Sequence, residues 1–492
     1  MADNGNLPGG LQKQSGQSEP SQGPATAERN PEATAAIRRG LDAAGRNDFE
    51  SAADAFEEAV AAAPDDAHAR YNLALALQQL GETDEAVLSY LRAIYLDPGL
   101  VEAYRNLGHL YRERDEEERA LEAFRGANEL DNTDDEIYTN IGDLYLELGF
   151  YDDAALAYRQ AQIVNPNNTL AAERLRETRE ETERQTAHIA ELERDVDAHP
   201  HDLERYERLC DVYLLAHREN DALNVANQMV ALAPSNPAAY ETLALVHETM
   251  NSEAEAAAAW QRVTELTPDD IEAWERLANW RQEMDDQEGA IDAYNHALQI
   301  DPEAVSARFN QADALREAQR YDDAIAIYRE LVHEFAEAAR DDDDPLAEAY
   351  TGLTASLNLA GRYPEALEAA EEFLERFPED PEASYEKAAA LDGLDRNSEA
   401  TPLYEHAVEL DMLNAGLRND LASAYLASGR IPEAADIAES AIALEPDFAS
   451  AYETLAQALL ALGRTDEAEA AAQRAAELHA ALDEGSDTST QP

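Results

Sequence analysis

The chain has 492 residues, of which 45% are hydrophobic, so it can bury a sizeable core and is not a disordered polymer. Its 37 Lys and Arg residues against 104 Asp and Glu residues give a net charge of −67 at pH 7. This charge, with no dense run of Lys or Arg, excludes nucleic acid and anionic membrane surfaces as partners.

The first part of the chain carries no targeting or membrane signal. Residues 1–32 are rich in Gly, Gln, Ser and Pro, which predicts a disordered tail. The start MADNGNLPGG has neither the basic nor the apolar region of a signal peptide, and no apolar stretch is long enough to span a bilayer. The single cysteine, Cys210, excludes an intrachain disulfide framework. We therefore expect a cytoplasmic protein without membrane insertion.

From residue 33 onward the sequence repeats every 34 residues. A proline marks most units at one fixed position, and the step from Pro302 to Pro378 is 76 residues, or two periods plus eight. An alanine stands twelve positions before this mark in every unit but one, where His188 replaces it. The thirteen units begin at residues 33, 67, 101, 135, 169, 203, 237, 271, 305, 347, 381, 415 and 449.

Each unit is predicted to be a pair of amphipathic helices. In the second unit, ARYNLALALQQL is the first helix, GETD is the turn and EAVLSYLRAIYL is the second helix. The column alanine is small because two helix backbones cross closely there. Neither helix buries its apolar stripe alone, so neighbouring units have to stack into an all-α solenoid.

The unit at 101–134 carries the residues that identify the repeat. These residues are Tyr104, Leu107, Gly108, Tyr111, Ala120, Phe124 and Ala127. Together with the proline column they resemble the tetratricopeptide repeat (TPR) consensus, and the resemblance extends from residue 33 to about 480.

The resemblance implies about 13 stacked TPR units in a right-handed superhelix. It also implies a scaffold or adaptor that binds extended peptides or partner proteins in the concave groove. A co-chaperone-like protein or an assembly factor for a multi-subunit complex is the alternative, and an RNA-binding helical repeat protein fits the acidic composition less well. We expect no enzyme activity and no cofactor, because the sequence shows no nucleophile–base pair, phosphate loop or metal cluster.

The unit at 169–202 keeps its length but loses the repeat signature. RLRETREETERQTAH contains almost no apolar residue and no turn residue. One long linking helix, acting as a hinge or spacer, is preferred here over a degenerate hairpin. The chain would then comprise four repeats at 33–168, the linking segment at 169–202, eight repeats at 203–482 and a disordered tail at 483–492.

An acidic insertion near residues 337–346 accounts for the extra eight residues. The insertion follows a second helix, which should therefore project beyond its neighbours. The run DDDD at 341–344 lacks the spaced ligands of a calcium loop and is interpreted as a solvated acidic corner.

An asparagine recurs at the same place in three successive units. Asn72, Asn106 and Asn140 lie on the face of the first helix opposite the apolar stripe. In the family this face lines the groove, and the arrangement resembles the asparagine ladder of O-linked N-acetylglucosamine transferase, whose amides grip a peptide backbone. The alternative is that the asparagines only help to pack the groove.

Three further side chains share the face of Asn106. Arg105, His109 and Arg112 would suit an acidic or carboxylate group of the bound peptide. The cations of the family's clamp for chaperone C-termini are absent from the equivalent positions of the first three units, so that clamp is not predicted.

The composition also resembles that of proteins from extreme halophiles. Only two lysines occur, Lys13 and Lys387, beside the large excess of carboxylates. This pattern is typical of halophilic archaea, whose cytoplasm is concentrated KCl, and it predicts that folding requires salt.

Overall fold

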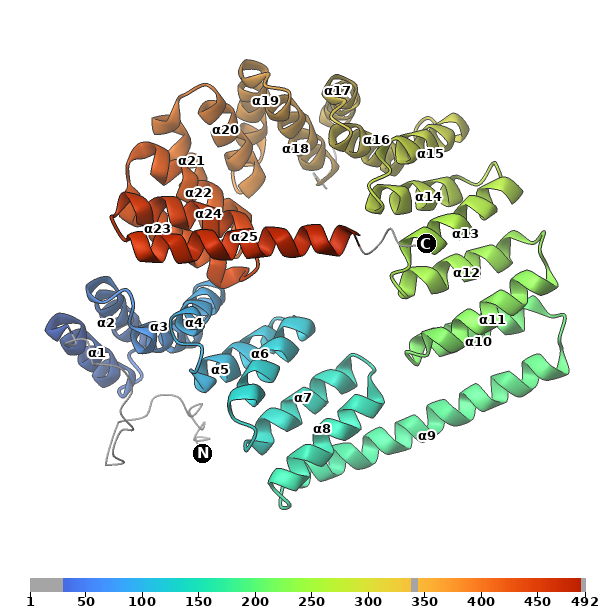
Figure 1. The fold of residues 1–492 in the computed structure, drawn as a ribbon, viewed down its shortest axis with the longest axis horizontal. Coiled ribbons are helices and arrows are strands. Elements are labelled where there is room, and N and C mark those ends of the chain that lie inside the picture. Colours follow the sequence, from blue (N-terminus) through green and yellow to red (C-terminus); the bar gives the residue numbers. More distant parts are fainter. Residues whose placement is uncertain (1–29, 338–343, 488–492) are drawn as a thin grey trace. The chain divides into compact units, whose positions relative to one another are not determined.

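The computed structural model describes residues 30–337 and 344–487, and these residues form 25 helices with no strand among them (Figure 1). The helices up to residue 198 are α1 (Pro31–Ala44), α2 (Phe49–Ala62), α3 (Ala67–Leu80), α4 (Thr83–Leu96), α5 (Val101–Glu113), α6 (Glu117–Leu130), α7 (Asp135–Glu147), α8 (Tyr151–Val164) and α9 (Thr169–Ala198).

The remaining helices form eight further pairs. They are α10 (Leu203–Leu215), α11 (Glu219–Leu232), α12 (Pro237–Thr249), α13 (Glu253–Leu266), α14 (Ile271–Glu283), α15 (Gln287–Ile300), α16 (Val305–Glu317), α17 (Tyr321–Glu337), α18 (Asp344–Leu359), α19 (Tyr363–Arg376), α20 (Pro381–Gly393), α21 (Asn397–Leu410), α22 (Ala415–Ser428), α23 (Ile431–Leu444), α24 (Ala449–Ala461) and α25 (Thr465–Asp487). The predicted all-α architecture of paired helices is confirmed.

In each helix pair, the turn between the two helices contains one residue with a left-handed backbone conformation. A positive φ is readily adopted by Gly and tolerated by Asn and Asp, which fill most of these positions. The equivalent of this residue in the unit at 169–202 is Glu183, which lies inside α9. The turn residues are Asn47, Gly81, Asp115, Gly149, His217, Asn251, Asp285, Gln319, Gly361, Asp395, Gly429 and Gly463.

The column alanines and the aromatic residues that follow them form the core. Ala120 and Phe124 of α6 are fully buried, and Ala154 and Tyr158 of α8 repeat the arrangement one unit later. At Gly142 of α7 a Cβ atom would lie 2.6 Å from the Tyr158 ring, so only glycine allows this approach of helix and ring. The full burial of Ala120 and Ala154 agrees with the small side chains predicted at the alanine column.

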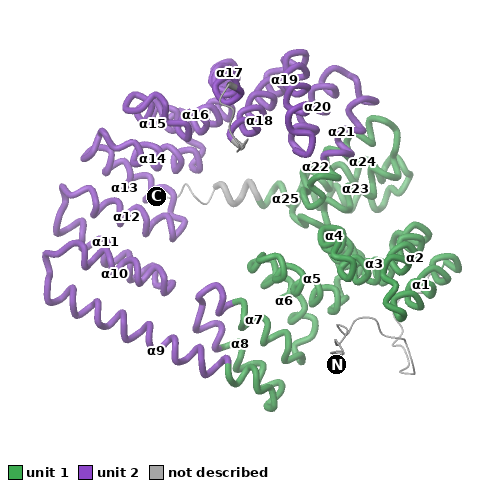
Figure 2. Tube along the Cα trace, turned by 180° about the vertical axis from the view of Figure 1, so that it is seen from behind, with its two compact units in different colours: residues 1–144, 156–173, 408–492 green, residues 145–155, 174–407 purple. Residues whose placement is uncertain are grey.

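The helices group into two compact units (Figure 2). Unit 1 comprises residues 1–144, 156–173 and 408–492, and unit 2 comprises residues 145–155 and 174–407. Within unit 1, α4 contacts α23, although the two helices are far apart in the sequence. Within unit 2, one continuous core runs from Ala244 to Ala390.

Several segment boundaries differ from the expected ones. The Asn30 side chain caps the first turn, so α1 begins at Pro31, inside the predicted tail. At the other end α25 continues to Asp487, into the segment predicted to be disordered from residue 483. Residues 338–343 of the acidic insertion lie outside the described residues. On its two sides, α17 has 17 residues and α18 has 16, against 13 or 14 in most other pairs.

Candidate functional site

The three ladder asparagines lie on the first helices of consecutive repeats. Asn72 is on α3, Asn106 on α5 and Asn140 on α7, each at the sixth position of its repeat. Asn72 and Asn106 are half-buried, whereas Asn140 is only 8% exposed. The three amides therefore occupy equivalent places in the helices but unequal environments.

Hydrogen bonds connect this face from one repeat to the next. Asn106 Nδ2 donates to the Tyr71 hydroxyl on α3 at 3.2 Å. Arg112 Nη1 on α5 donates to Asn140 Oδ1 on α7 at 3.3 Å. Polar side chains thus link the first helices of the second, third and fourth repeats.

Two of the amides also bond to their own helices. Asn72 Nδ2 donates to the His68 carbonyl at 2.8 Å, and Asn140 Nδ2 donates to the Glu136 carbonyl at 3.0 Å. A carboxamide has two N–H groups and one carbonyl oxygen. These bonds use one donor of each amide and hold its plane in a fixed orientation.

The two predicted arginines are both paired within the protein. Arg105 Nη2 lies 2.6 Å from Asp134 Oδ2, and Arg112 Nη1 lies 3.6 Å from Asp143 Oδ2. A carboxylate of a ligand would have to compete with these acidic residues. The arrangement favours recognition by the amides over recognition by charge.

His109 contributes a ring and not a charge. It packs edge-on against Phe124, with ring centroids 5.0 Å apart. Burial lowers the pKa of His109, so the imidazole is neutral near pH 7.

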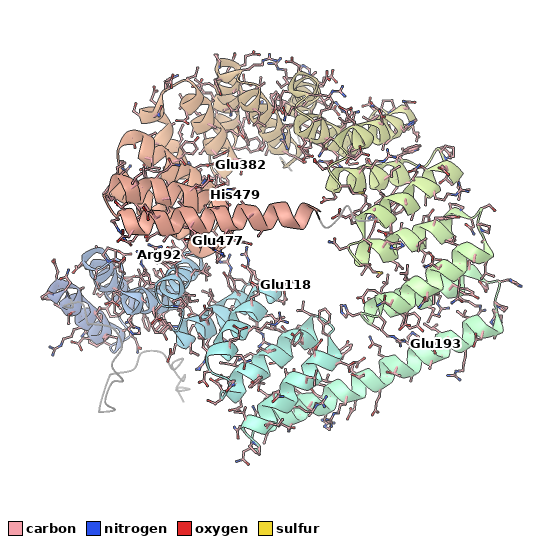
Figure 3. The ribbon with its side chains drawn as sticks, in the orientation of Figure 1. Arg92, Glu118, Glu193, Glu382, Glu477 and His479 are labelled. Carbon is pink, nitrogen blue, oxygen red and sulfur yellow. The ribbon has the colours of Figure 1, made fainter. Side chains whose placement is uncertain are left out.

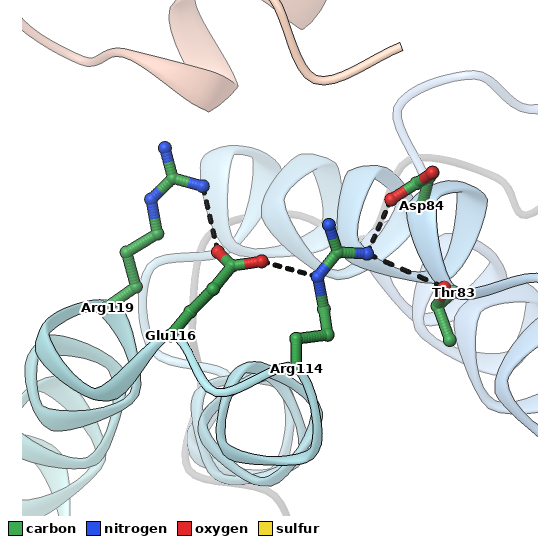
Figure 4. A network of polar contacts seen from close by, with 5 residues as sticks. All are labelled: Thr83, Asp84, Arg114, Glu116 and Arg119. Atoms are coloured by element: carbon green, nitrogen blue, oxygen red, sulfur yellow. Dashed lines mark hydrogen bonds and ion pairs between the residues drawn. The ribbon is translucent and has the colours of Figure 1, made fainter. Parts of the chain in front are cut away.

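A network of ion pairs borders the same helices and was not predicted from the sequence (Figure 4). Arg114 Nη1 lies 2.5 Å from Asp84 Oδ1, and Arg114 Nε lies 2.5 Å from Glu116 Oε1. Arg119 Nη1 binds the other oxygen of Glu116 at 2.9 Å. The turn between α5 and α6 is therefore tied to the start of α4.

Unit 2 places other polar groups on its first helices. Glu386 of α20 occupies the repeat position of the ladder asparagines and is 5% exposed. Asn358 of α18 donates to its Oε2 at 2.7 Å. Glu248 of α12 accepts hydrogen bonds from the indole nitrogens of Trp260 and Trp280, both at 2.6 Å. The repeat phase gives the positions of these carboxylates but not their burial.

The described residues include carboxylates, histidines and one thiol. No group of three or more His, Cys, Asp or Glu among them is arranged to hold a metal ion. Burial raises the pKa of the Cys210 thiol to about 12, so the reactive thiolate is scarce near neutral pH. None of the helices described is both long and apolar enough to cross a membrane.

Comparisons with known proteins agree with the repeat assignment. Models of the tetratricopeptide repeat match residues 37–101, 101–134, 135–168, 276–345, 360–415 and 426–482. No curated protein matches the chain.

Several solved structures are similar to the chain at low identity. Yeast Tom70 is 16% identical with a TM-score of 0.37, and the match covers 90% of this chain and 96% of Tom70. A chain of the APC/C hetero-tetramer Cut9–Hcn1 is 12% identical with a TM-score of 0.35, covering 87% of this chain and 96% of that one. A chain of Naa15/Naa10 bound to HypK-THB is 15% identical with a TM-score of 0.32, covering 93% and 77%.

Proposed function

Because the chain belongs to the tetratricopeptide-repeat family, we propose that it is a protein-interaction scaffold that binds an extended peptide segment of a partner along α3, α5 and α7. The observation that carries the proposal is the recurrence of an asparagine at the sixth position of three consecutive repeats, namely Asn72, Asn106 and Asn140. An amide supplies a donor and an acceptor and so can pair with the N–H and C=O groups of any peptide backbone.

The spacing of the repeats suits an extended ligand. Helices that pack against each other lie about 8–10 Å apart. A polyproline II chain rises about 3.1 Å per residue with three residues per turn, so equivalent backbone groups recur about every 9 Å. One amide would therefore meet every third residue of the peptide on the same side of its backbone.

Backbone recognition also fits the charge of the protein. Salt at molar concentration screens exposed charges over about 3 Å, which weakens charge-based attraction. Concentrated salt weakens hydrogen bonds in a half-buried groove less, because buried groups are screened much less than exposed ones. Ligands of different sequence would then bind through one common interaction, with side-chain pockets adding preference.

The experiment begins with a phage-displayed library of random peptides. The library is selected on the full chain in about 1 M KCl, where the Debye length is about 3 Å. The affinity of the best peptide is then measured by fluorescence anisotropy for the wild type and for the triple variant Asn72→Ala, Asn106→Ala, Asn140→Ala. At about 0.5–1.5 kcal/mol for each bond, the triple variant should bind roughly ten- to a thousandfold more weakly if the effects add.

A matched control separates this effect from the loss of any asparagine. Asn227 of the second helix α11 is exposed, and its Nδ2 donates to the Leu223 carbonyl at 2.9 Å, the same local bond that Asn72 makes. Asn227→Ala should leave the affinity unchanged. A triple variant that binds the selected peptide as tightly as the wild type would show that the asparagines only pack the groove.

A further inference from the structure

Unit 1 contains a cavity of about 350 Å³ between helices of its early and late repeats. Three arginines line it: Arg70 from α3, Arg92 from α4 and Arg418 from α22. We call this space the arginine cavity. In a chain with 104 acidic residues and 37 basic ones, the convergence of three cations on one cavity needs a physical reason.

Arg92, which Figure 3 labels, comes from α4 and is the most deeply buried of the three. It is 4% exposed. Its Nη2 atom pairs with Glu439 and lies 3.6 Å from Asp436, both on α23. Its Nε and Nη1 atoms are buried and have no hydrogen-bond partner among the described residues. A buried donor without an acceptor destabilises the folded state, and more so when the group is charged.

The neighbouring arginines add to the shortage of acceptors. Arg70 Nη2 lies 3.5 Å from Asp436, and Arg70 Nε is another buried donor without a partner in the described part of the chain. Arg418 Nε donates to the Met412 carbonyl at 2.8 Å. The carboxylate of Asp436 thus lies beside two guanidinium groups, those of Arg70 and Arg92.

The guanidinium groups keep their charge in spite of burial. Burial lowers the pKa of Arg92 and of Arg418 to about 10, so both groups carry a positive charge at neutral pH. Glu57, Glu82 and Glu85 also line the cavity, and Glu57 and Glu82 are exposed. Exposed carboxylates are screened by salt, whereas buried guanidinium groups are screened much less. What the cavity lacks is acceptors at three buried donors, Arg92 Nε, Arg92 Nη1 and Arg70 Nε, which have no hydrogen-bond partner among the described residues.

The cavity also has an apolar wall. Leu73 and Leu77 of α3 and Ile437 of α23 face the space beside the arginines. A water molecule takes up about 30 Å³ of liquid, so the cavity has room for roughly ten waters or for a ligand much larger than an inorganic ion. A lining that combines guanidinium groups with apolar side chains suits an amphipathic anion.

We propose that the arginine cavity binds a small organic carboxylate with a short apolar chain. The carboxylate accepts hydrogen bonds from Arg92 and Arg70, and the chain packs against the leucines and Ile437. Because α3 and α4 belong to the second repeat and α22 and α23 to the twelfth, the bound anion joins two segments that are distant in the sequence. Ligand binding stabilises the contact between α4 and α23 by mass action.

The test uses sodium hexanoate as the probe and the full chain in KCl. Saturation-transfer-difference NMR follows the hexanoate protons as the ligand is titrated, which gives a dissociation constant. We expect saturable binding to the wild type and at least about a tenfold loss of affinity, worth about 1.4 kcal/mol, in Arg92→Gln. Arg92→Lys keeps the charge but removes the Nε and Nη1 donors, so it should bind weakly too while disturbing the fold less.

A control variant and two competing ligands test whether hexanoate binds in the arginine cavity through both its charge and its apolar chain. Arg329 pairs with Glu365 at 2.6 Å on the surface of unit 2, and Arg329→Gln should bind hexanoate as the wild type does. Hexylammonium, which has the same chain and the opposite charge, should not compete. Hexanoate that fails to bind at any KCl concentration would mean that only water fills the cavity and would overturn the proposal. Inorganic phosphate that competes as well as hexanoate would overturn the role of the apolar wall.

Discussion

Asn140 differs from Asn72 in its hydrogen-bond partners. Its carbonyl accepts from Arg112 of the preceding repeat, and its Nδ2 group bonds within α7. Within the described part of the chain, Asn72 bonds to the His68 carbonyl of its own helix and to no neighbouring repeat. The position in the repeat is the same, but the neighbours that a side chain reaches depend on the repeats before and after it.

This difference predicts unequal effects on stability. Asn140→Ala should lower the free energy of unfolding by about 1 kcal/mol or more, because the Arg112 donor loses a buried acceptor. Asn72→Ala should change it by less than about 0.5 kcal/mol. Urea denaturation of both variants at one KCl concentration measures the difference. Equal free energies of unfolding for the two variants would show that the bond between Arg112 and Asn140 contributes nothing.

Glu386 provides a second test at the scale of one residue. Burial raises its pKa to about 7 from 4.5, in spite of the hydrogen bond from Asn358 and the nearby charge of Arg316. The folded state therefore holds this proton more tightly than the unfolded state. Its contribution to stability is complete below about pH 4.5 and is lost as the pH rises to about 7, a difference of about 3 kcal/mol.

Glu386→Gln removes the charge while keeping a side chain of similar size. Relative to the wild type, this variant should gain stability as the pH rises from about 5 to about 8. Denaturation of both proteins across this pH range at constant KCl measures the difference, in which the titration of the other carboxylates cancels. A difference that does not change with pH would show that Glu386 is ionised throughout.

The sequence predicts the columns of residues better than their contacts. The 34-residue period places Asn72, Asn106 and Asn140 at equivalent positions of α3, α5 and α7, but it does not predict that Asn140 is buried. It does not predict that Arg105 pairs with Asp134 at the end of its own repeat, because a long flexible side chain reaches several carboxylates and the packing of the helices decides among them. The burial of Glu386 depends on the packing of α18 beside it and is equally absent from the pattern.

Among the helices, α9 shows how one residue type decides between a turn and a helix. The left-handed position is filled by Gly, Asn or Asp in nearly every pair, and a helix-forming glutamate, Glu183, stands there in α9. The lack of a turn residue was the signal in the sequence, and residues 169–198 form one helix. Its role as a hinge and the division of the chain into two repeat blocks beside it stay predictions.

The packing of helix pairs predicts a large effect of side-chain size. Ala120 of α6 is fully buried at the crossing of two helices, so Ala120→Leu should lower the free energy of unfolding by about 1–3 kcal/mol or more. Ala472 of α25 is exposed, and Ala472→Leu is the matched control, with an expected change within about 0.5 kcal/mol. Urea denaturation monitored by circular dichroism compares the two. Similar free energies for both variants would contradict a close crossing at the alanine column.

At the scale of the whole molecule, the net charge of −67 opposes folding. Many arginines pair locally with acids, such as Arg396 with Glu399 at 2.7 Å, but 37 cations cannot neutralise 104 anions. The Debye length is about 10 Å at 0.1 M salt and about 3 Å at 1 M, so concentrated salt removes most of the repulsion. The composition predicts this dependence without any knowledge of the fold.

The helical circular dichroism signal should collapse when the protein is dialysed from molar KCl to roughly 0.1 M KCl. Dialysis back to high salt should restore it, which separates reversible repulsion from aggregation. A sharp melting transition that survives in low salt would contradict the requirement for salt.

The most direct test of peptide binding by the asparagine ladder is a double-mutant cycle between Asn106 and the peptide backbone. The selected peptide is synthesised with one amide after another replaced by an ester, which removes a single N–H donor, and each version is titrated against the wild type and Asn106→Ala. We predict that at one peptide position the ester lowers the affinity for the wild type but not for the variant, with a coupling of about 0.5–1.5 kcal/mol. A coupling of zero at every position would contradict backbone recognition by the ladder.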